Sequence, residues 1–482
     1  MGILVYILLA FCALLLSLVA VLLVRTLAFR PHGGVTAGEK DTDFDGDRAI
    51  ESLRTLVRFP TVSYRDSVKE DDAAFAGLIA ALPTLYPRVF AACEYTELPD
   101  RALLFRWRGK SADAPSVMMA HYDVVPVDEA GWEKPPFDAI LENGVIWGRG
   151  TLDTKVTFNA ILFAVDTLIG RGLVPENDIY LAFSGGEEVN GRGAPNIVAY
   201  FKERGITPAL VLDEGGAVVE NVFPGVCAPC GMIGIAEKGM VDVLYRTRSA
   251  GGHASAPKPH TPVGVLSAAC ARVENDPFPM HLSRPALAMF DTLGRHSTFL
   301  YRMIFANLWL FRPVLDSLCK KSGGELNALL RTTVAFTQMS GSAASNVIPP
   351  EATMVSNIRL NPADTVESAL ARLSKTVKDE SVEISAIHGM NPSRISEIGC
   401  PAWDKVALAV SSTWQGCIVT PYLMVQCSDS RHYGEISDKV YRFSAMDLTA
   451  AERATIHGHN ERIRVSTARD AVSFYLALLK QC

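Results

Sequence analysis

A histidine and a carboxylate two positions apart end an apolar run in the first third of the chain. The run is Val117-Met-Met-Ala-His121-Tyr-Asp123, and a short apolar stretch of this kind is typical of a buried parallel strand. In an extended chain, the side chains of His121 and Asp123 point to the same side. His121 could therefore bind a metal while Asp123 fixes the imidazole tautomer. A polar strand end that faces water is the alternative for an isolated His-x-Asp.

Three more motifs contain carboxylates, and each follows an apolar run or precedes an apolar helix. They are Gly148-Arg-Gly-Thr-Leu-Asp153, Ile179-Tyr-Leu-Ala-Phe-Ser-Gly-Gly-Glu187-Glu188 and Ala209-Leu-Val-Leu-Asp213. Taken singly, Asp153 could be a helix N-cap and the two glutamates a solvated turn. Taken together with His121, they lie where strands alternate with helices. This pattern predicts a mostly parallel sheet whose strands present these residues in one crevice at their carboxyl ends.

The predicted crevice gathers imidazole and carboxylate groups without thiolates. Such a donor set favours Zn²⁺, Mn²⁺ or Co²⁺ over a structural cysteine-rich site. Converging carboxylates repel one another unless positive charge lies between them. Two metal ions that share a bridging aspartate would supply that charge.

The order of these motifs resembles the M20 family of co-catalytic zinc peptidases and, within it, the carboxypeptidase S branch. The resemblance extends from about Asp47 to the C-terminus and includes Gly131-Trp-Glu-Lys-Pro-Pro-Phe137, Asn346-Val-Ile-Pro-Pro350 and Ile456-His457-Gly-His-Asn-Glu461. It implies two zinc ions in each active site, with Mn²⁺ or Co²⁺ as alternatives. One residue departs from the pattern, because Thr154 stands where the family usually has a second aspartate.

The resemblance also implies a role for each matching residue. Glu187 would be the general base, and Asp123 would orient His121. The implied metal ligands are His121, Asp153 (bridging both ions), Glu188, Asp213 and His457. The implied substrate-binding residues are His253, Asn346 and Arg359, and Arg431 in the large domain is a second candidate for binding an anion. An arginine suits a substrate carboxylate, because its planar guanidinium pairs with both oxygens.

The implied reaction is hydrolysis of an amide bond next to a free carboxylate. The substrate would be a peptide, as for a carboxypeptidase, or an N-acyl amino acid, as for an N-fatty-acyl-amino-acid hydrolase/synthase. A catalytically silent, membrane-tethered binding protein is the non-enzymatic alternative. Loss of Glu187 or of a metal ligand would favour that alternative, and none is lost. The net charge of −6 and the lack of a basic block give no case for nucleic acid as a partner.

The expected fold class is α/β, with two domains. Residues 47–238 and 391–482 would form the di-metal peptidase domain around the mostly parallel sheet. Residues 239–390 would form an inserted α+β domain in the order β-α-β-β-α-β, with an extra apolar insert at 277–330. This second domain resembles the family's lid, which implies a homodimer through it as one assembly.

The N-terminal segment has the length of a membrane span. Residues 3–24 hold no charged side chain, and these 22 residues at ~1.5 Å each cover about 33 Å, enough for a bilayer core of ~30 Å. A cleavable signal peptide has a shorter apolar region of ~7–15 residues after a basic start. We therefore expect an uncleaved single-pass anchor over residues 1–30, and a linker over residues 31–46. Cleavage is the alternative, and the side of the membrane stays open.

Overall fold

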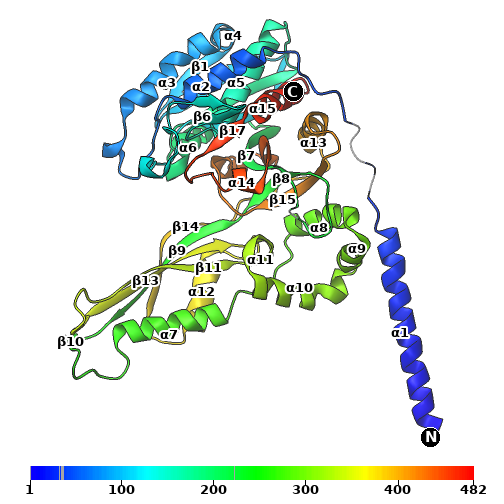
Figure 1. Ribbon diagram of the computed structural model, residues 1–482, viewed down its shortest axis with the longest axis vertical. Coiled ribbons are helices and arrows are strands. Elements are labelled where there is room, and N and C mark those ends of the chain that lie inside the picture. The colour runs from blue at the N-terminus through cyan, green and yellow to red at the C-terminus, as the bar shows by residue number, and fades with distance from the viewer. Residues whose placement is uncertain (1, 32, 34–36, 222) are drawn as a thin grey trace.

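The large domain is built around an eight-stranded mixed sheet with the order β1-β2-β6-β3-β7-β16-β8-β15. The computed structural model describes residues 2–31, 33, 37–221 and 223–482 (Figure 1). The strands are β1 (Glu94–Leu98), β2 (Ala102–Trp107), β3 (Ser111–His121), β6 (Asn177–Ser184), β7 (Leu210–Val219), β8 (Cys230–Glu237), β15 (Ile418–Met424) and β16 (Val440–Leu448).

The sheet differs from the expected one in three of its strand pairs. The central pairs β6–β3, β3–β7 and β7–β16 are parallel, and so is β15–β8. The pairs β1–β2, β2–β6 and β16–β8 are antiparallel. The expectation of a mostly parallel sheet therefore holds for the centre, whereas the whole sheet is mixed.

Helices cover both faces of this sheet, which explains why its strands are apolar runs rather than alternating patterns. Along β2, Leu103 and Phe105 pack into the main core, whereas Ala102 and Leu104 pack against the opposite layer. The main-core face carries α2 (Gly46–Val57), α3 (Asp72–Leu85), α4 (Pro87–Ala92), α5 (Lys155–Gly170), α13 (Pro401–Thr413) and α15 (Val465–Leu479). The opposite face carries α6 (Gly193–Glu203) and η4 (Asp429–Glu435).

The second domain contains a four-stranded antiparallel sheet with the order β11-β13-β9-β14. Its strands alternate between buried and partly exposed residues, because helices cover one face only. The elements are β9 (Gly239–Arg248), α7 (Pro262–Asn275), β11 (Thr333–Ser340), β13 (Glu351–Leu360), α12 (Val366–Val377) and β14 (Glu383–Met390). A two-stranded pair, β10 (Gly252–His253) with β12 (Val347–Ile348), forms the far tip of this domain (Figure 1).

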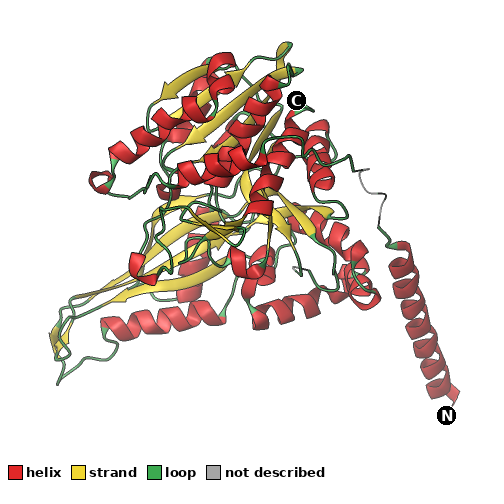
Figure 2. Ribbon diagram, turned by 45° about the horizontal axis from the view of Figure 1, so that its top comes forward, coloured by secondary structure: helices red, strands yellow, loops and turns green. Residues whose placement is uncertain are grey.

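The apolar insert forms four helices that pack on the large domain. They are α8 (Arg284–His296), α9 (Phe299–Ala306), α10 (Leu308–Ser322) and α11 (Gly324–Leu330) (Figure 2). Phe290, Leu293 and Phe305 join the main hydrophobic core, and α8 lies against β15 at the sheet edge. The insert therefore belongs by packing to the large domain, although the second domain flanks it in sequence.

The N-terminal helix α1 (Gly2–Ala28) leaves the body as a separate rod (Figure 1). Among the described residues, it is the one helix whose length and composition would let it cross a membrane. A small three-stranded sheet, β4 (Ile140–Glu142), β5 (Val145–Trp147) and β17 (Arg462–Arg464), completes the large domain beside the carboxyl end of the main sheet.

Candidate active site

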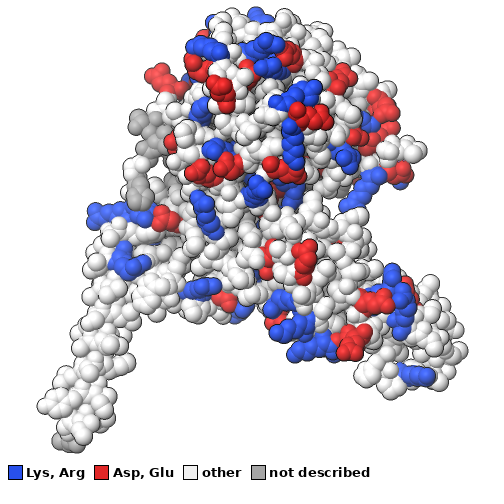
Figure 3. All heavy atoms as spheres, turned by 180° about the vertical axis from the view of Figure 1, so that it is seen from behind, with Lys and Arg blue, Asp and Glu red and all other residues white. Residues whose placement is uncertain are grey.

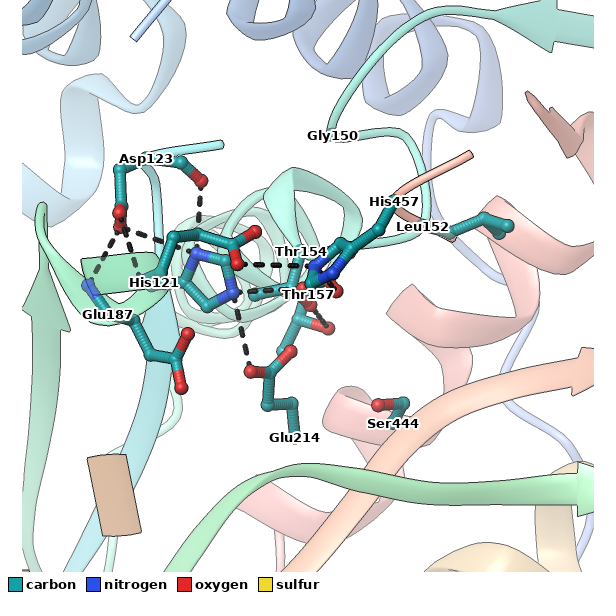
Figure 4. Close-up of polar contacts among 12 residues, drawn as sticks. His121, Asp123, Gly150, Leu152, Thr154, Thr157, Glu187, Glu214, Ser444 and His457 are labelled. Carbon is teal, nitrogen blue, oxygen red and sulfur yellow. Dashed lines mark hydrogen bonds and ion pairs between the residues drawn. The ribbon is translucent and has the colours of Figure 1, made fainter. Parts of the chain in front are cut away.

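Three neighbouring parallel strands deliver the first site residues to one edge of the sheet. His121 is the last residue of β3, Glu187 opens the short helix η3 (Glu187–Val189) directly after β6, and Glu214 lies in β7. Because β6, β3 and β7 are adjacent and parallel, their carboxyl ends meet. Figure 4 shows His121 between Asp123 and Glu214, with Glu187 on one side and His457 on the other.

Two groups of side chains could each hold a metal ion. His121, Glu187 and Glu214 form one, and His121, Asp153 and Glu188 form the other, with ligand atoms within 4.8 Å of one another. Nε2 of His121 lies 2.9 Å from Oδ1 of Asp153 and 3.3 Å from Oε1 of Glu214.

His457 lies on the far side of Asp153 from His121. Its Nε2 is 3.1 Å from Oδ2 of Asp153 and 3.2 Å from Oε2 of Glu188. Asp153 thus presents one oxygen to each histidine, which is the arrangement that a bridging carboxylate requires. His459, the other histidine of that motif, packs against Gly131 instead.

Asp123 holds the two glutamates as well as the histidine. Its fully buried carboxylate accepts hydrogen bonds from the backbone N–H of Glu187 and of Glu188, both at 3.2 Å, and from Ser63 Oγ at 2.7 Å. Nδ1 of His121 lies 3.0 Å from the Asp123 carbonyl oxygen and 3.4 Å from its carboxylate. An acceptor at Nδ1 leaves Nε2 available toward the metal groups.

Glu461 positions the loop that presents Asp153. Its buried carboxylate accepts backbone N–H bonds from Gly150 at 3.1 Å, Leu152 at 2.7 Å and Asp153 at 3.2 Å. Arg149 donates to Glu461 at 2.6 Å and to the carbonyl of Gly458 at 2.8 Å, so it ties this loop to the His457 loop. The sequence contained the signal for this role, because Glu461 ends the motif that supplies His457.

The structure places Glu214, and not Asp213, in the metal groups. The carboxylate of Asp213 accepts the Ser430 N–H at 2.9 Å on the other side of β7. The pairing of β7 with β16 skips Glu214 and Gly215, and Gly215 has φ of +145°. This bulge changes the direction of the Glu214 side chain, and a strict strand alternation could not predict it.

Burial and mutual repulsion raise the pKa values of Glu187, Glu214 and Asp429 in this crevice. Burial raises the pKa of Glu187 well above its usual range, and it raises the pKa of Glu214 to about 8. Burial also raises the pKa of Asp429, which accepts a hydrogen bond from Ser184, to about 7. Hydrogen bonds to Asp153 and Glu188 raise the pKa of His457 to about 10.

These residues fit a pair of metal ions. Oε1 of Glu188 is buried and has no hydrogen-bond partner among the described residues, so one oxygen of a crowded carboxylate is left for a cation. The donors are imidazole nitrogens and carboxylate oxygens, which suit Zn²⁺, Mn²⁺ or Co²⁺. Glu187, a partly buried glutamate within one of these groups, could act there as a base, which is the arrangement of a metal-dependent hydrolase. The fold and the site together define this class.

The comparisons place the chain in a family. Residues 117–481 match the profile of Peptidase family M20/M25/M40, and the protein belongs to this family, whose members are metallopeptidases and amidohydrolases. The chain is 34% identical over 98% of its length to the N-fatty-acyl-amino acid synthase/hydrolase PM20D1 of Xenopus tropicalis, and it covers 94% of that protein. It is 31% identical over 97% of its length to the "Probable carboxypeptidase S-like 2" of Dictyostelium discoideum, of which it covers 92%.

Solved structures share the fold. The M20 metallo-carboxypeptidase Sso-CP2 from Sulfolobus solfataricus superimposes with a TM-score of 0.66 at 18% identity, over 90% of this chain and 98% of that one. Human carnosine dipeptidase 1 gives a TM-score of 0.64 at 15% identity, over 91% and 97%. The resemblance seen in the sequence motifs is thus confirmed at the level of family and fold.

Two of the expected substrate-binding residues lie far from the metal groups. His253 and Asn346 are exposed at the tip formed by β10 and β12, where the Asn346 carbonyl accepts the Ala254 N–H at 2.9 Å (Figure 1). His253 Nδ1 is 2.8 Å from Ser255 Oγ. Within one chain, neither residue joins the site.

The two expected arginines end beside the same loop of the large domain. Arg359, in β13, has Nε 3.2 Å from Asn357 Oδ1 and Nη1 3.7 Å from the sulfur of Cys427. Arg431 donates to the Asn391 carbonyl at 2.9 Å and lies 3.8 Å from Glu237. The loop that contains Arg431 contacts the strand ends of the site, since Asp429 accepts a hydrogen bond from Ser184, the last residue of β6.

Proposed function

We propose that the protein hydrolyses the amide bond of N-acyl amino acids or small peptides next to a free carboxylate. The carrying observation is that Arg359 of the second domain contacts the loop over residues 427–431 of the large domain, which contains Arg431 and lies beside buried carboxylates. In such a site an arginine would bind the free carboxylate of the substrate, and a carboxylate of the protein would act as the base. The names of the relatives favour N-fatty-acyl amino acids as substrates, with carboxypeptidase S-like peptide cleavage as the second candidate.

The proposed ligands are His121, Asp153, Glu188, Glu214 and His457, with Asp153 shared by two zinc ions. Mn²⁺ and Co²⁺ suit the same donors. Glu214 replaces Asp213 in this assignment, because Glu214 Oε1 lies 3.3 Å from His121 Nε2 while Asp213 bonds to Ser430. When bound, the ions polarise the scissile carbonyl and lower the pKa of a water toward ~7.

Glu187 would act as the general base. Its carboxylate removes a proton from the attacking water and later passes it to the nitrogen of the leaving amine. The raised pKa of Glu187 suits the first step, because a stronger base accepts the proton more readily. Asp123 keeps Glu187 in place through its backbone N–H and keeps the His121 ring oriented.

Arg359 is the first candidate for the substrate carboxylate. Among the described residues, its Nη1 has only a weak sulfur acceptor at 3.7 Å. Arg431 already contacts Glu237 and the Asn391 carbonyl, although its buried Nη1 has no hydrogen bond. A planar guanidinium could pair with both oxygens of a carboxylate.

His253 and Asn346 would complete the site only from a second copy of the chain. Both residues are exposed on the distal tip of the second domain and would reach across a dimer to stabilise the substrate's oxyanion. This assembly accounts for the distance between the tip and the metal groups in one chain.

We also propose that α1 is retained as a single-pass membrane anchor. Thr26, near its end, is fully buried against the body. Cleavage near residue 28 would remove the partner of that contact. The proposal leaves the side of the membrane undecided.

A substrate panel on the zinc-loaded full chain tests the proposed reaction. N-acyl amino acids with short and long acyl chains are compared with dipeptides, and metal content is measured on the same preparation. We expect release of the free amino acid from at least one of these classes. Full metal occupancy without cleavage of any amide would refute the proposal and favour a binding protein. Cleavage of dipeptides alone would select the peptidase alternative.

A further inference from the structure

The end of α1 is fixed to the body by buried polar contacts. Asn307, between α9 and α10, is fully buried, and its side-chain N–H groups donate to the carbonyls of Leu22 at 3.3 Å and Met303 at 2.9 Å. Its Nδ2 also lies 3.4 Å from the hydroxyl of the fully buried Thr26. The turn between α9 and α10 is therefore joined to the last turns of α1.

Two arginines strengthen this junction. The guanidinium of Arg25 donates twice to the Ala306 carbonyl, at 3.2 and 3.1 Å. Arg295 of α8 stacks 4.3 Å from the centre of the Phe29 ring and donates to the Arg30 carbonyl at 3.0 Å. These bonds fix the direction in which α1 leaves the body.

The helices beside this junction expose an apolar surface. Five large apolar side chains are at least half exposed on α9 and α10, namely Phe299 (51%), Leu300 (62%), Trp309 (57%), Val314 (56%) and Leu318 (60%). Val314 and Leu318 are one helical turn apart and face the same way. Single exposed apolar residues are ordinary, whereas a cluster indicates a binding surface.

The contact between Asn307 and Leu22 sets the level of these five side chains along the apolar span of α1. Leu22 lies within the uncharged run that ends at residue 24, so Asn307 is level with the end of the apolar span. The cluster flanks Asn307 in sequence on both sides. Figure 3 shows α1 as a rod without charged side chains over most of its length, with charged side chains gathered where the rod meets the body.

We propose that α9 and α10 lie in the interfacial layer of the bilayer that α1 crosses, with the five apolar side chains among the acyl chains. The inference rests on the proposed anchor. Amphipathic helices bind the interface through an apolar face and basic flanks, and exposed Arg312, Lys320 and Lys321 supply the basic flank here. The protein then has two membrane contacts, a span and a platform, and they hold the body in one orientation.

A second copy of the chain is the competing occupant of this surface. The bilayer is favoured because α1 leaves the body beside α9 and α10. The most apolar stretch of α1 has no residue buried in the protein, so lipid is its expected surrounding. A protein partner there would have to share its space with lipid headgroups.

Photolabelling of the full chain in vesicles tests the proposal. The protein is reconstituted in phosphatidylcholine vesicles that contain a lipid with a diazirine in its acyl chain, and labelled residues are mapped by mass spectrometry. We expect labels on α1 and on residues 299–318. The double variant Leu300→Glu/Leu318→Glu should lose labels on α9 and α10 while it keeps those on α1. Val174→Glu, at an exposed apolar site of the large domain (55% exposed), is the matched control and should leave the pattern unchanged.

The outcomes separate the inference from the anchor. Labels on α1 alone overturn the platform and leave the anchor standing. Labels on neither segment refute both. Amine cross-links between Lys320 or Lys321 of two chains, without lipid labels on α9 and α10, overturn the platform in favour of self-association. Hydrolysis of a short, soluble substrate should be unchanged in both variants, which keeps this test independent of the catalytic proposal.

Discussion

The backbone N–H of Glu187 donates a hydrogen bond of 3.2 Å to the carboxylate of Asp123. The candidate base is therefore held by the residue that also contacts His121. A change at Glu187 that preserves the backbone leaves this bond in place, which allows the chemistry of the side chain to be tested separately from its position.

Glu187→Gln should abolish most turnover while it preserves fold and metal content. An amide cannot accept the water proton, and general acid–base catalysis contributes ~10²-fold or more. The measurement is kcat on the substrate found by the panel, with metal analysis of the same sample. Glu176→Gln, on the exposed surface, is the control. Near-normal turnover in Glu187→Gln would remove it from the role of base.

Glu214→Gln should lower metal occupancy, whereas Asp213→Asn should retain it. Glu214 faces His121 at 3.3 Å, and Asp213 accepts a backbone bond that an asparagine oxygen could also accept. Asp153→Ala should reduce both ions, since Asp153 contacts both histidines. Elemental analysis after dialysis measures these occupancies. Loss of one ion in Asp213→Asn with full content in Glu214→Gln would restore the assignment made from the sequence.

Arg359→Lys should raise KM for an acid substrate far more than for its carboxamide. A site built for a carboxylate leaves its buried cation unpaired when the analogue lacks that charge, and a lysine offers a point charge in place of a planar fork. The ratio of kcat/KM for acid and carboxamide measures the preference. Arg431→Lys is the matched comparison. If only Arg431→Lys abolishes the preference, Arg431 is the residue that binds the substrate carboxylate. Equal rates on both substrates in the unmodified protein would show that no arginine binds this carboxylate.

Lys238 should contribute a rise in the free energy of unfolding with pH between about 7 and 9, against the opposite contributions of Glu214 and His457, whose pKa values are raised to about 8 and about 10. Burial lowers the pKa of Lys238 to about 7 from an ordinary 10.5, so in this range the unfolded chain binds a proton that the folded chain does not. Each such lysine contributes a slope of up to about 1.4 kcal/mol per pH unit. Lys238→Met should reduce the slope measured by denaturant titration, and the exposed Lys110→Met should not.

The buried Lys155, whose pKa is also lowered to about 7 by burial, maintains part of the slope in Lys238→Met. Buried cysteines such as Cys93, whose pKa burial raises to about 12, act with the opposite sign above pH 9, so the measurement stops there. An unchanged slope in Lys238→Met would mean that this lysine stays charged in the folded protein.

Much of the fold follows from patterns in the sequence. The apolar runs before His121 and Glu187 agree with β3 and β6, because a strand buried on both faces leaves a local run of apolar residues. The three antiparallel pairs were missed, since nothing in a single apolar strand indicates the direction of its neighbour. The insert was identified as apolar, but its attachment to β15 depends on tertiary packing.

Site residues could be predicted from the sequence where a single motif lies at the end of a single strand. His121 and Glu188 lie in the metal groups that their motifs indicated. The position of Glu214 in a group that could hold a metal ion depends on a bulge at Gly215, and a bulge leaves little trace in a sequence. The role of Glu461 depends on three backbone N–H groups from another loop, and spacing alone does not report such bonds.

The insert also changes how the two domains are joined. The chain passes between the main core and the core of the second domain four times: after Lys238, near Phe278, at Arg331 and after Met390. The side chain of Lys238 donates to the Ala328 and Arg331 carbonyls, and Arg331 donates to the Phe278 carbonyl. Three of the crossings are thus bonded to one another. Three bonded crossings restrict rotation of one domain relative to the other. The second domain and the main sheet of the large domain should therefore move together rather than as two freely hinged bodies.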